Sequence, residues 1–322
     1  MNNVSIKILK ATKRIYLQYL AKSSTMPIIS REENPDIASE YIYRALMDDQ
    51  PRMIARFGST EMLCVLNYLG VKNPKKDIIA FIKGKARPWW WEDKTINQMY
   101  QWSGFFPPTI DKIEQFCELM LREISNVDIL GSWLTDENSF EQELRNSYKV
   151  NLELLNPYFS KIPWTKALEG KNVLVVHPFA ETIETQYQLR EKLFDSNLLP
   201  AFNLKTIKAV QSIAGEKSSY SSWFEALDYM KTEINKHNYD ICLIGCGAYG
   251  FPLAAHVKLM GKKGFHLGGS LQLLFGIRGK RWENENYNSI FNYAKLMNQY
   301  WVRPSILDKP ENAIIVEGAC YW

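Results

Sequence analysis

Five short apolar runs, each followed by a segment with a helical pattern, most constrain the fold of this chain. The runs cover residues 53–57, 127–131, 173–176, 241–244 and 264–266. Apolar strands that alternate with helices are typical of an open parallel sheet. We therefore expect an α/β fold with a mostly parallel sheet. Ligands of such sheets bind outside the carboxyl ends of the strands, where this sequence gathers its unusual polar, Gly and His residues.

Helices are predicted around these strands, over residues 37–47, 59–69, 110–124, 140–155, 183–194, 223–237, 251–260 and 287–300. A late apolar run at residues 313–316 is predicted to add an edge strand.

Residues 72–108 differ in kind from the rest of the chain. They hold four prolines and the run Trp89-Trp90-Trp91, so we expect an insertion or flap outside the sheet. Indole rings stack on sugars, so this flap could bind a carbohydrate, such as the acceptor of a sugar transfer. The alternative for each single Trp is that it anchors the flap to the core.

Composition narrows the class of protein. The chain has 322 residues, of which 46% are hydrophobic and 23% charged, as in a globular protein. Its five cysteines are scattered without a Cys-x-x-Cys pair, which suits a reducing compartment. No apolar stretch approaches the roughly 18 residues of a spanning helix, and the start lacks the apolar core of a signal peptide. We expect a cytoplasmic protein.

The net charge of +4 is unevenly spread. All charged side chains of residues 1–22 are basic, and they are interleaved with Ile and Leu. A basic amphipathic helix is one interpretation, and it predicts peripheral contact with anionic lipid at the inner face of the membrane. The alternative is a solvated helix packed on the domain. The remaining chain shows no basic stripe with base-stacking aromatics, so nucleic acid is not an expected partner.

A glycine-rich turn follows the apolar run at residues 241–244. It reads Gly245-Cys246-Gly247-Ala248-Tyr249-Gly250 and precedes an apolar helix, which is the context that the GxGxxG pattern requires. Glycines let the backbone approach a diphosphate, which the helix N-terminus then holds. No acidic residue stands about 20 positions later, so a nicotinamide dinucleotide is not favoured. A plain tight turn is the alternative.

The first apolar run ends in Arg56-Phe57-Gly58-Ser59-Thr60-Glu61. Arg56 could pair with a phosphate, while Glu61 could accept sugar hydroxyls or hold a divalent ion. Alternatively, Ser59 caps the following helix and Glu61 complements the helix dipole.

This turn, the block from Asp240 to Gly245, the helix at residues 253–259, Gly261 and His266-Leu267-Gly268-Gly269 together resemble the GT-D glycosyltransferases. This Rossmann-like family builds bacterial surface glycans. The resemblance covers about residues 50–282. It implies a nucleotide-diphosphate sugar donor and, through the family's Asp-x-Glu pair, a divalent metal such as manganese or magnesium. Ser59 stands at the position of that Asp, so Glu61 alone remains of the pair.

Sugar transfer that inverts the anomeric centre requires a base near the attacking oxygen, and the leaving diphosphate requires positive charge or hydrogen-bond donors. The predicted catalytic residues are Glu61, His177 and Glu181, and Asp136 is a further base candidate. The residues predicted to bind the nucleotide sugar are Arg56, Gly58, Ser59, Gly245, Gly247, Ala248, Tyr249, Gly250, His266, Gly268, Gly269, Arg278, Lys280 and Arg281.

The chain is thus predicted to be a single Rossmann-like domain at residues 51–282 with a helical basic arm at 1–50 and a C-terminal helix and tail at 283–322. The predicted function is a glycosyltransferase that moves a sugar from a nucleotide-diphosphate sugar to a glycan or lipid-linked acceptor in surface polysaccharide synthesis. A nucleotide-dependent oxidoreductase or epimerase and a non-catalytic nucleotide-sugar binding module are the alternatives.

Overall fold

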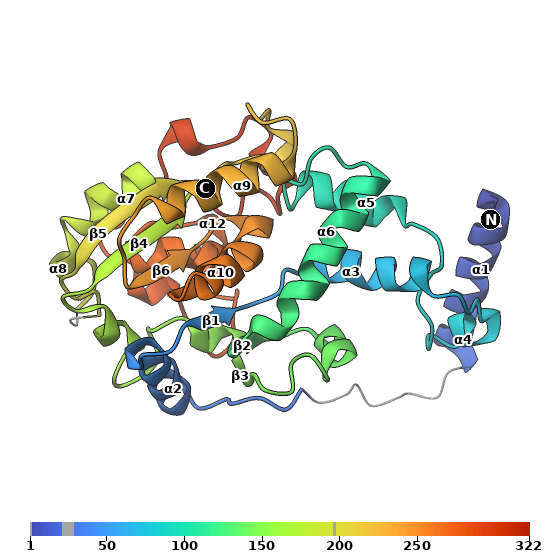
Figure 1. Ribbon diagram of the computed structural model, residues 1–322, viewed down its shortest axis with the longest axis horizontal. Helices are drawn as coiled ribbons and strands as arrows, with labels where there is room; N and C mark the ends of the chain where they lie inside the picture. The colour runs from blue at the N-terminus through green and yellow to red at the C-terminus, as the bar shows by residue number, and fades with distance from the viewer. Residues whose placement is uncertain (1, 21–28, 196–197) are drawn as a thin grey trace.

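The computed structural model describes residues 2–20, 29–195 and 198–322. A seven-stranded sheet forms its centre, and every ladder in it is parallel (Figure 1). The strand order is β3-β2-β1-β7-β6-β4-β5. The strands are β1 Arg52–Ala55, β2 Ile129–Ser132, β3 Tyr148–Asn151, β4 Asn172–His177, β5 Asn203–Lys208, β6 Ile241–Ile244 and β7 Lys263–His266. The predicted α/β fold with a parallel sheet is confirmed.

The five predicted strands are all present, and they occupy the five central positions of the sheet. The two edge strands, β3 and β5, were not predicted, because edge strands carry polar side chains and lack an apolar run. The helix predicted over residues 140–155 is wrong. That segment holds part of a 3-10 turn at Thr135–Phe140, then β3, then a second 3-10 turn at Leu152–Leu155.

Alternate side chains of the central strands enter two separate cores. Val173 and Val175 of β4 belong to one core, and Leu174 and Val176 belong to the other. Both faces of the sheet are therefore covered, as parallel sheets require. One core contains side chains of α3 Ser59–Lys72, α6 Ile110–Glu123, α9 Trp223–Asn235 and α10 Gly250–Leu259. The other contains side chains of α2 Pro35–Met47, α7 Ala180–Tyr187, α8 Arg190–Leu193 and α11 Leu271–Leu274.

The C-terminal extension consists of short helical turns. After α12 Lys280–Glu283, the chain forms 3-10 turns at Ala294–Leu296, Ile306–Asp308 and Ala313–Ile315. The long helix predicted over residues 287–300 and the edge strand predicted at 313–316 are therefore wrong. Individual anchors hold this segment instead: the buried Trp301 indole donates to the Leu193 carbonyl oxygen over 2.8 Å.

The insertion at residues 72–108 contains α4 Ile78–Ile82 and α5 Asp93–Gln101. The tryptophans at residues 89–91 pack on nearby aromatic side chains. Trp89 and Trp90 contact the Phe81 ring edge-on, with ring centroids 5.6 and 5.1 Å away, and Trp91 lies beside Tyr68. Trp91 therefore anchors the insertion to the core, whereas Trp89 and Trp90 pack within the insertion.

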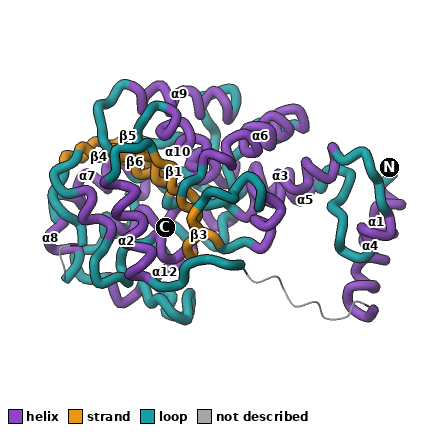
Figure 2. Tube along the Cα trace, turned by 60° about the horizontal axis from the view of Figure 1, so that its bottom comes forward, coloured by secondary structure: helices purple, strands orange, loops and turns teal. Residues whose placement is uncertain are grey.

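The N-terminal arm begins with α1 Asn3–Ile15 and a π-helical turn at Tyr16–Leu20. Residues 1 and 21–28 of the predicted arm lie outside the described residues. Figures 1 and 2 both place α1 beside α4, at the end of the molecule remote from the sheet. Among the described helices, none has the length and apolar character that a membrane crossing requires.

Candidate functional site

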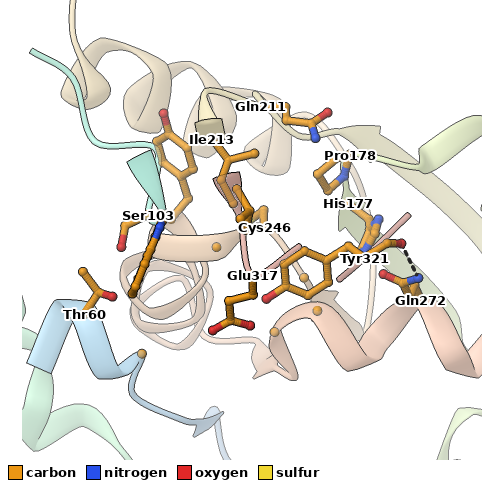
Figure 3. A pocket seen from close by; sticks show the side chains of 18 of the residues that line it. Thr60, Ser103, His177, Pro178, Gln211, Ile213, Cys246, Gln272, Glu317 and Tyr321 are labelled. Carbon is orange, nitrogen blue, oxygen red and sulfur yellow. Dashed lines mark hydrogen bonds between the residues drawn. The ribbon is translucent and has the colours of Figure 1, made fainter. Parts of the chain in front are cut away.

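A cavity of about 200 Å³ lies at the carboxyl edge of the sheet. Residues that follow six of the seven strands line it, β3 being the exception. Figure 3 shows Thr60 and Ser103 on one side of it and His177 and Gln272 on the other. The predicted site residues that line the cavity are Arg56, Gly58, Ser59, Glu61, His177, Gly245, Gly247, Tyr249, His266, Gly268, Gly269 and Arg281.

Two glycines of the turn after β6 are required for packing. A Cβ on Gly245 would lie 2.7 Å from the Gly268 carbonyl oxygen, and a Cβ on Gly250 would lie 2.1 Å from the His266 ring. These contacts hold the turn tightly against the end of β7. Gly247 differs, because its φ of +58° places it in the left-handed region and a Cβ there would meet nothing closer than 3.9 Å.

The same turn offers backbone donors. The amides of Gly247 and Ala248 have no hydrogen-bond acceptor among the described residues, and α10 begins two residues later. Such free amides at a helix start bind anions. Ala248 itself is buried behind the cavity wall, and Tyr249 stacks on Trp223 with ring centroids 4.8 Å apart.

Arg56 brings a cation into the cavity. Its guanidinium lies over the Trp133 ring, 5.3 Å from the centroid, and the Trp133 indole donates to the Phe57 carbonyl oxygen over 3.0 Å. Burial lowers the pKa of Arg56, while the charge of Glu61 raises it. Arginine stays protonated under such shifts. Within the described part of the chain, Arg56 has no ion-pair partner within 4.0 Å.

Glu61 lies in the first turn of α3 and lines the cavity. Its carboxylate folds back over the helix start, where a Cβ on Gly58 would come within 1.7 Å of Glu61 Oε2. Gly58 is the N-cap residue and Ser59 is exposed, so Ser59 does not cap the helix. The negative charge of Glu61 complements the helix dipole. The carboxylate nevertheless has no hydrogen-bond donor among the described residues.

His177 is a buried hydrogen-bond donor on the cavity wall. The Phe179 amide donates to His177 Nδ1 over 3.0 Å, so the proton of the neutral ring is on Nε2. Burial lowers the pKa of His177 to about 3. A base works best when its pKa is near the working pH. The geometry therefore favours His177 as a donor to a ligand rather than as the predicted base.

His266 is also buried, but the proton of its ring lies on the other nitrogen. Its Nδ1 lies 3.4 Å from the Ile244 carbonyl oxygen, which can only accept, so Nδ1 carries the proton and Nε2 keeps its lone pair. Burial, and then the charge of Arg56, lower the pKa of His266 to about 3. Both histidines are therefore uncharged at neutral pH.

Several predicted residues lie outside the cavity. Glu181 is exposed on α7 and pairs with Lys208 over 3.4 Å. Asp136 pairs with Arg87 of the insertion over 2.6 Å. Arg278 donates to the Trp301 carbonyl oxygen over 2.6 Å, and Lys280 is exposed. Arg281 is the member of that basic cluster that lines the cavity, and it forms an ion pair with Glu317.

The structure adds cavity residues that the sequence did not reveal. Trp102 and Ser103 reach the cavity from the insertion, so this segment does contribute an indole, although not from the triple Trp. Tyr321 covers Gly269, and its carbonyl oxygen accepts from Gln272 over 3.1 Å (Figure 3). No local pattern identifies these residues, because the folded chain brings them to the sheet edge.

Glu137 positions the loop after β2 and was also not predicted. It is fully buried and accepts from the Ser132 hydroxyl and, over 3.1 Å each, from the amides of Trp133 and Leu134. These bonds fix the loop from which Trp133 reaches Arg56.

The carboxylates of the cavity do not fit a divalent ion held by the protein alone. Glu61 is the unpaired carboxylate, Glu317 is paired with Arg281, and a Ser hydroxyl is a poor ligand for a hard cation. Within residues 2–20, 29–195 and 198–322, no group of three or more His, Cys, Asp or Glu side chains is placed to hold a metal.

Comparisons of the chain with protein-family models, with curated proteins and with solved structures found no match.

Replacing Glu137 tests its role in the loop. Glu137→Ala leaves a buried hydroxyl and two partly buried amides without an acceptor, and we expect a loss of about 2 to 4 kcal/mol in the free energy of unfolding. Glu137→Gln keeps the shape and one oxygen, so we expect a loss below about 1.5 kcal/mol. Urea unfolding of both variants measures the difference. Equal losses would contradict the role of the carboxylate oxygens.

The two neutral histidines predict a pH dependence of stability. Each has a folded pKa of about 3, below its unfolded value near 6.5. The unfolded chain therefore binds more protons below pH 6.5, and stability is lost as the pH falls from there toward 3. Between pH 7 and pH 5 each histidine contributes a loss of about 2 kcal/mol.

His177→Asn isolates this effect, because the Asn amide oxygen can accept from the Phe179 amide in place of Nδ1. Urea unfolding at pH 7 and pH 5 is expected to show about 2 kcal/mol less pH-dependent loss in the variant than in the parent. The carboxylates titrate equally in both proteins and cancel in the comparison. An unchanged pH dependence would show that His177 is not held neutral.

Proposed function

We propose that this chain is a glycosyltransferase that binds a nucleotide-diphosphate sugar in the cavity at the carboxyl edge of the sheet. It transfers the sugar to a hydroxyl of a glycan or lipid-linked acceptor, as in the synthesis of bacterial surface polysaccharides. The observation that carries this proposal is Arg56, a partly buried guanidinium that faces the cavity without an ion-pair partner among the described residues. A buried charge needs a counter-charge, and a bound diphosphate supplies one.

The diphosphate has further donors nearby. The free amides of Gly247 and Ala248 start the turn before α10, and Gly247 lines the cavity. The Nε2–H of His177 is a neutral donor on the same wall. Arg281 completes the set, although its charge is shared with Glu317. Two cations, the Gly247 amide and an imidazole N–H therefore line the same cavity and could meet the charge that develops on the leaving diphosphate.

Glu61 is the base that this arrangement supports best. Of the base candidates, Glu181 and Asp136 are paired outside the cavity, and His177 has its proton on Nε2. The free Glu61 carboxylate takes the proton from the acceptor hydroxyl as its oxygen bonds to the anomeric carbon. The bond from that carbon to the diphosphate oxygen breaks, and the diphosphate leaves with the electron pair toward Arg56.

Two partly exposed indoles offer surfaces on which the sugar or the nucleobase could pack. Trp102 is 39% exposed and Trp133 is 37% exposed, and both line the cavity. Aromatic faces pack on sugar rings and nucleobases while the indole N–H bonds to polar groups. We assign no step to a metal, because the carboxylates at hand do not form a protein-held site.

Binding of nucleoside diphosphates tests the proposal directly. Thermal-shift and calorimetric titrations with uridine, guanosine and other diphosphates and their sugars, with and without manganese, are expected to reveal one that stabilises the protein. Donor-sugar turnover separates a transferase from a binding module. If no nucleoside diphosphate or nucleotide sugar binds, the proposal fails.

Arg56→Ala is expected to weaken diphosphate binding at least about tenfold, because the cavity loses its unpaired cation. Arg44→Ala is the matched control. That arginine lies on the outer surface of α2 in an exposed ion pair with Glu40, and its removal should leave binding unchanged. Calorimetry measures both. Equal affinities in the parent and Arg56→Ala would overturn the role given to Arg56.

Gly247→Ala tests the glycine turn with its own control. Gly247 and Gly261 have positive φ values of +58° and +79°, so Ala at either costs about 1 kcal/mol in backbone strain. Gly261 lies outside the cavity with nothing within 4 Å of its Cβ. We expect similar losses of stability but a loss of diphosphate affinity in Gly247→Ala alone. Unchanged affinity in Gly247→Ala would make the turn purely structural.

A further inference from the structure

Helix α1 is anchored to the insertion along one face. Lys13 Nζ lies over the Phe81 ring of α4, 4.5 Å from its centroid, and Lys10 forms an ion pair with Glu92. Ile6 and Leu9, which share this face at 100° per residue, are partly buried. The helix therefore rests on the insertion and has a defined outer face.

That outer face is apolar and exposed. Val4, Ile8 and Ile15 are 65%, 60% and 57% exposed. On a helix of 3.6 residues per turn they lie within about 40° of one another, opposite the anchored face. None of the 13 residues of α1 is buried. The neighbouring α4 also exposes its first two isoleucines, Ile78 and Ile79.

Basic side chains lie beside this apolar face and on the neighbouring segment. Lys7 and Arg14 flank the stripe on α1, whereas Lys10 and Lys13 lie on the anchored face. We call residues 2–20 and 75–85 the α1–α4 platform. It holds eight basic side chains and one acidic side chain, Asp77, a net charge of +7, whereas the whole chain carries +4. The rest of the chain is therefore net negative. Apart from Lys10, none of the eight has an ion-pair partner in the part of the chain that the structure describes. The basic residues are Lys7, Lys10, Lys13, Arg14, Lys75, Lys76, Lys83 and Lys85.

We propose that the α1–α4 platform docks on an anionic lipid surface, with α1 in the plane of the interface. Its exposed isoleucines and Val4 enter the acyl boundary, and Lys7, Arg14 and the lysines of residues 75–85 meet the lipid phosphates. An exposed apolar stripe flanked by Lys and Arg is the composition of interfacial helices. The concentration of positive charge on an otherwise negative protein selects a negatively charged surface and orients the molecule toward it. This inference stands independently of the proposed function.

Co-sedimentation of the full chain with vesicles tests the docking. Vesicles of phosphatidylcholine with 30% phosphatidylglycerol provide the anionic surface, and pure phosphatidylcholine provides the neutral one. We expect binding to the anionic vesicles that is at least about tenfold tighter than to neutral ones and that falls at high salt. Failure to bind the anionic vesicles, or equal binding to both, overturns the proposal without any variant.

Two double variants separate the contributions. Ile8→Gln with Ile15→Gln removes apolar surface, and Lys7→Gln with Arg14→Gln removes two charges; each is expected to weaken anionic-vesicle binding about tenfold or more. All four side chains are exposed, so the melting temperature should not change. The matched control is Ile290→Gln with Ile306→Gln, which are both 77% exposed outside the platform. Weakening by this control to the same degree would overturn the assignment.

A second copy of the chain is the competing occupant of the stripe. Sedimentation velocity distinguishes it: a dimer that becomes a monomer in the Ile8→Gln, Ile15→Gln variant would make the stripe a subunit interface and overturn the lipid proposal. A monomer that binds anionic vesicles supports it. Diphosphate binding is measured separately on the same variants, so failure of the docking proposal is distinguishable from failure of the proposed function.

Discussion

The common direction of the seven strands is the constraint on which the site depends. A parallel sheet is buried on both faces, so neither face can hold a polar ligand site. All seven carboxyl ends meet at one edge, and the chain leaves six of them through residues that line the cavity. The position of the cavity thus follows from the topology. Its chemistry follows from the side chains next to each strand end, notably Arg56, His177 and His266.

Burial and hydrogen bonding give these three side chains different charges and roles. Both histidines are neutral because burial lowers their pKa to about 3. His177 accepts at Nδ1 and His266 donates from Nδ1, so their Nε2 atoms are a donor and an acceptor respectively. Arg56 keeps its charge, because even a lowered arginine pKa leaves it protonated. A ligand of this site therefore meets one unpaired positive charge beside neutral polar groups, which favours an anionic ligand with hydroxyls.

The sequence predicted the central strands because strands covered on both faces are continuous apolar runs. The sequence pattern did not reveal β3 and β5. These strands lie at the two edges of the sheet and are less buried, so polar residues can alternate along them, as in Asn203–Lys208. Most of the predicted site residues follow strand ends and line the cavity. Glu181 is one of those that do not, because a helix turns its side chains through 100° per residue and the direction of α7 is set by tertiary packing. Tyr321 could not be predicted, because it lies in the C-terminal extension, far from the strands in sequence. Glu137 could not be predicted either, because the loop after β2 has no sequence pattern that marks a buried carboxylate.

Helix α3 links the cavity to the α1–α4 platform through side-chain contacts. Its first turn supplies Glu61 to the cavity, and farther along the helix Asn67 donates to the Trp90 carbonyl oxygen and accepts from the Glu92 amide, both over 2.9 Å. Glu92 in turn pairs with Lys10 of α1. The helix rises about 9 Å from Glu61 to Asn67, so two hydrogen bonds and one ion pair connect α1 to the helix that supplies Glu61. If the platform docks on a surface as proposed, this linkage would keep the cavity close to that surface.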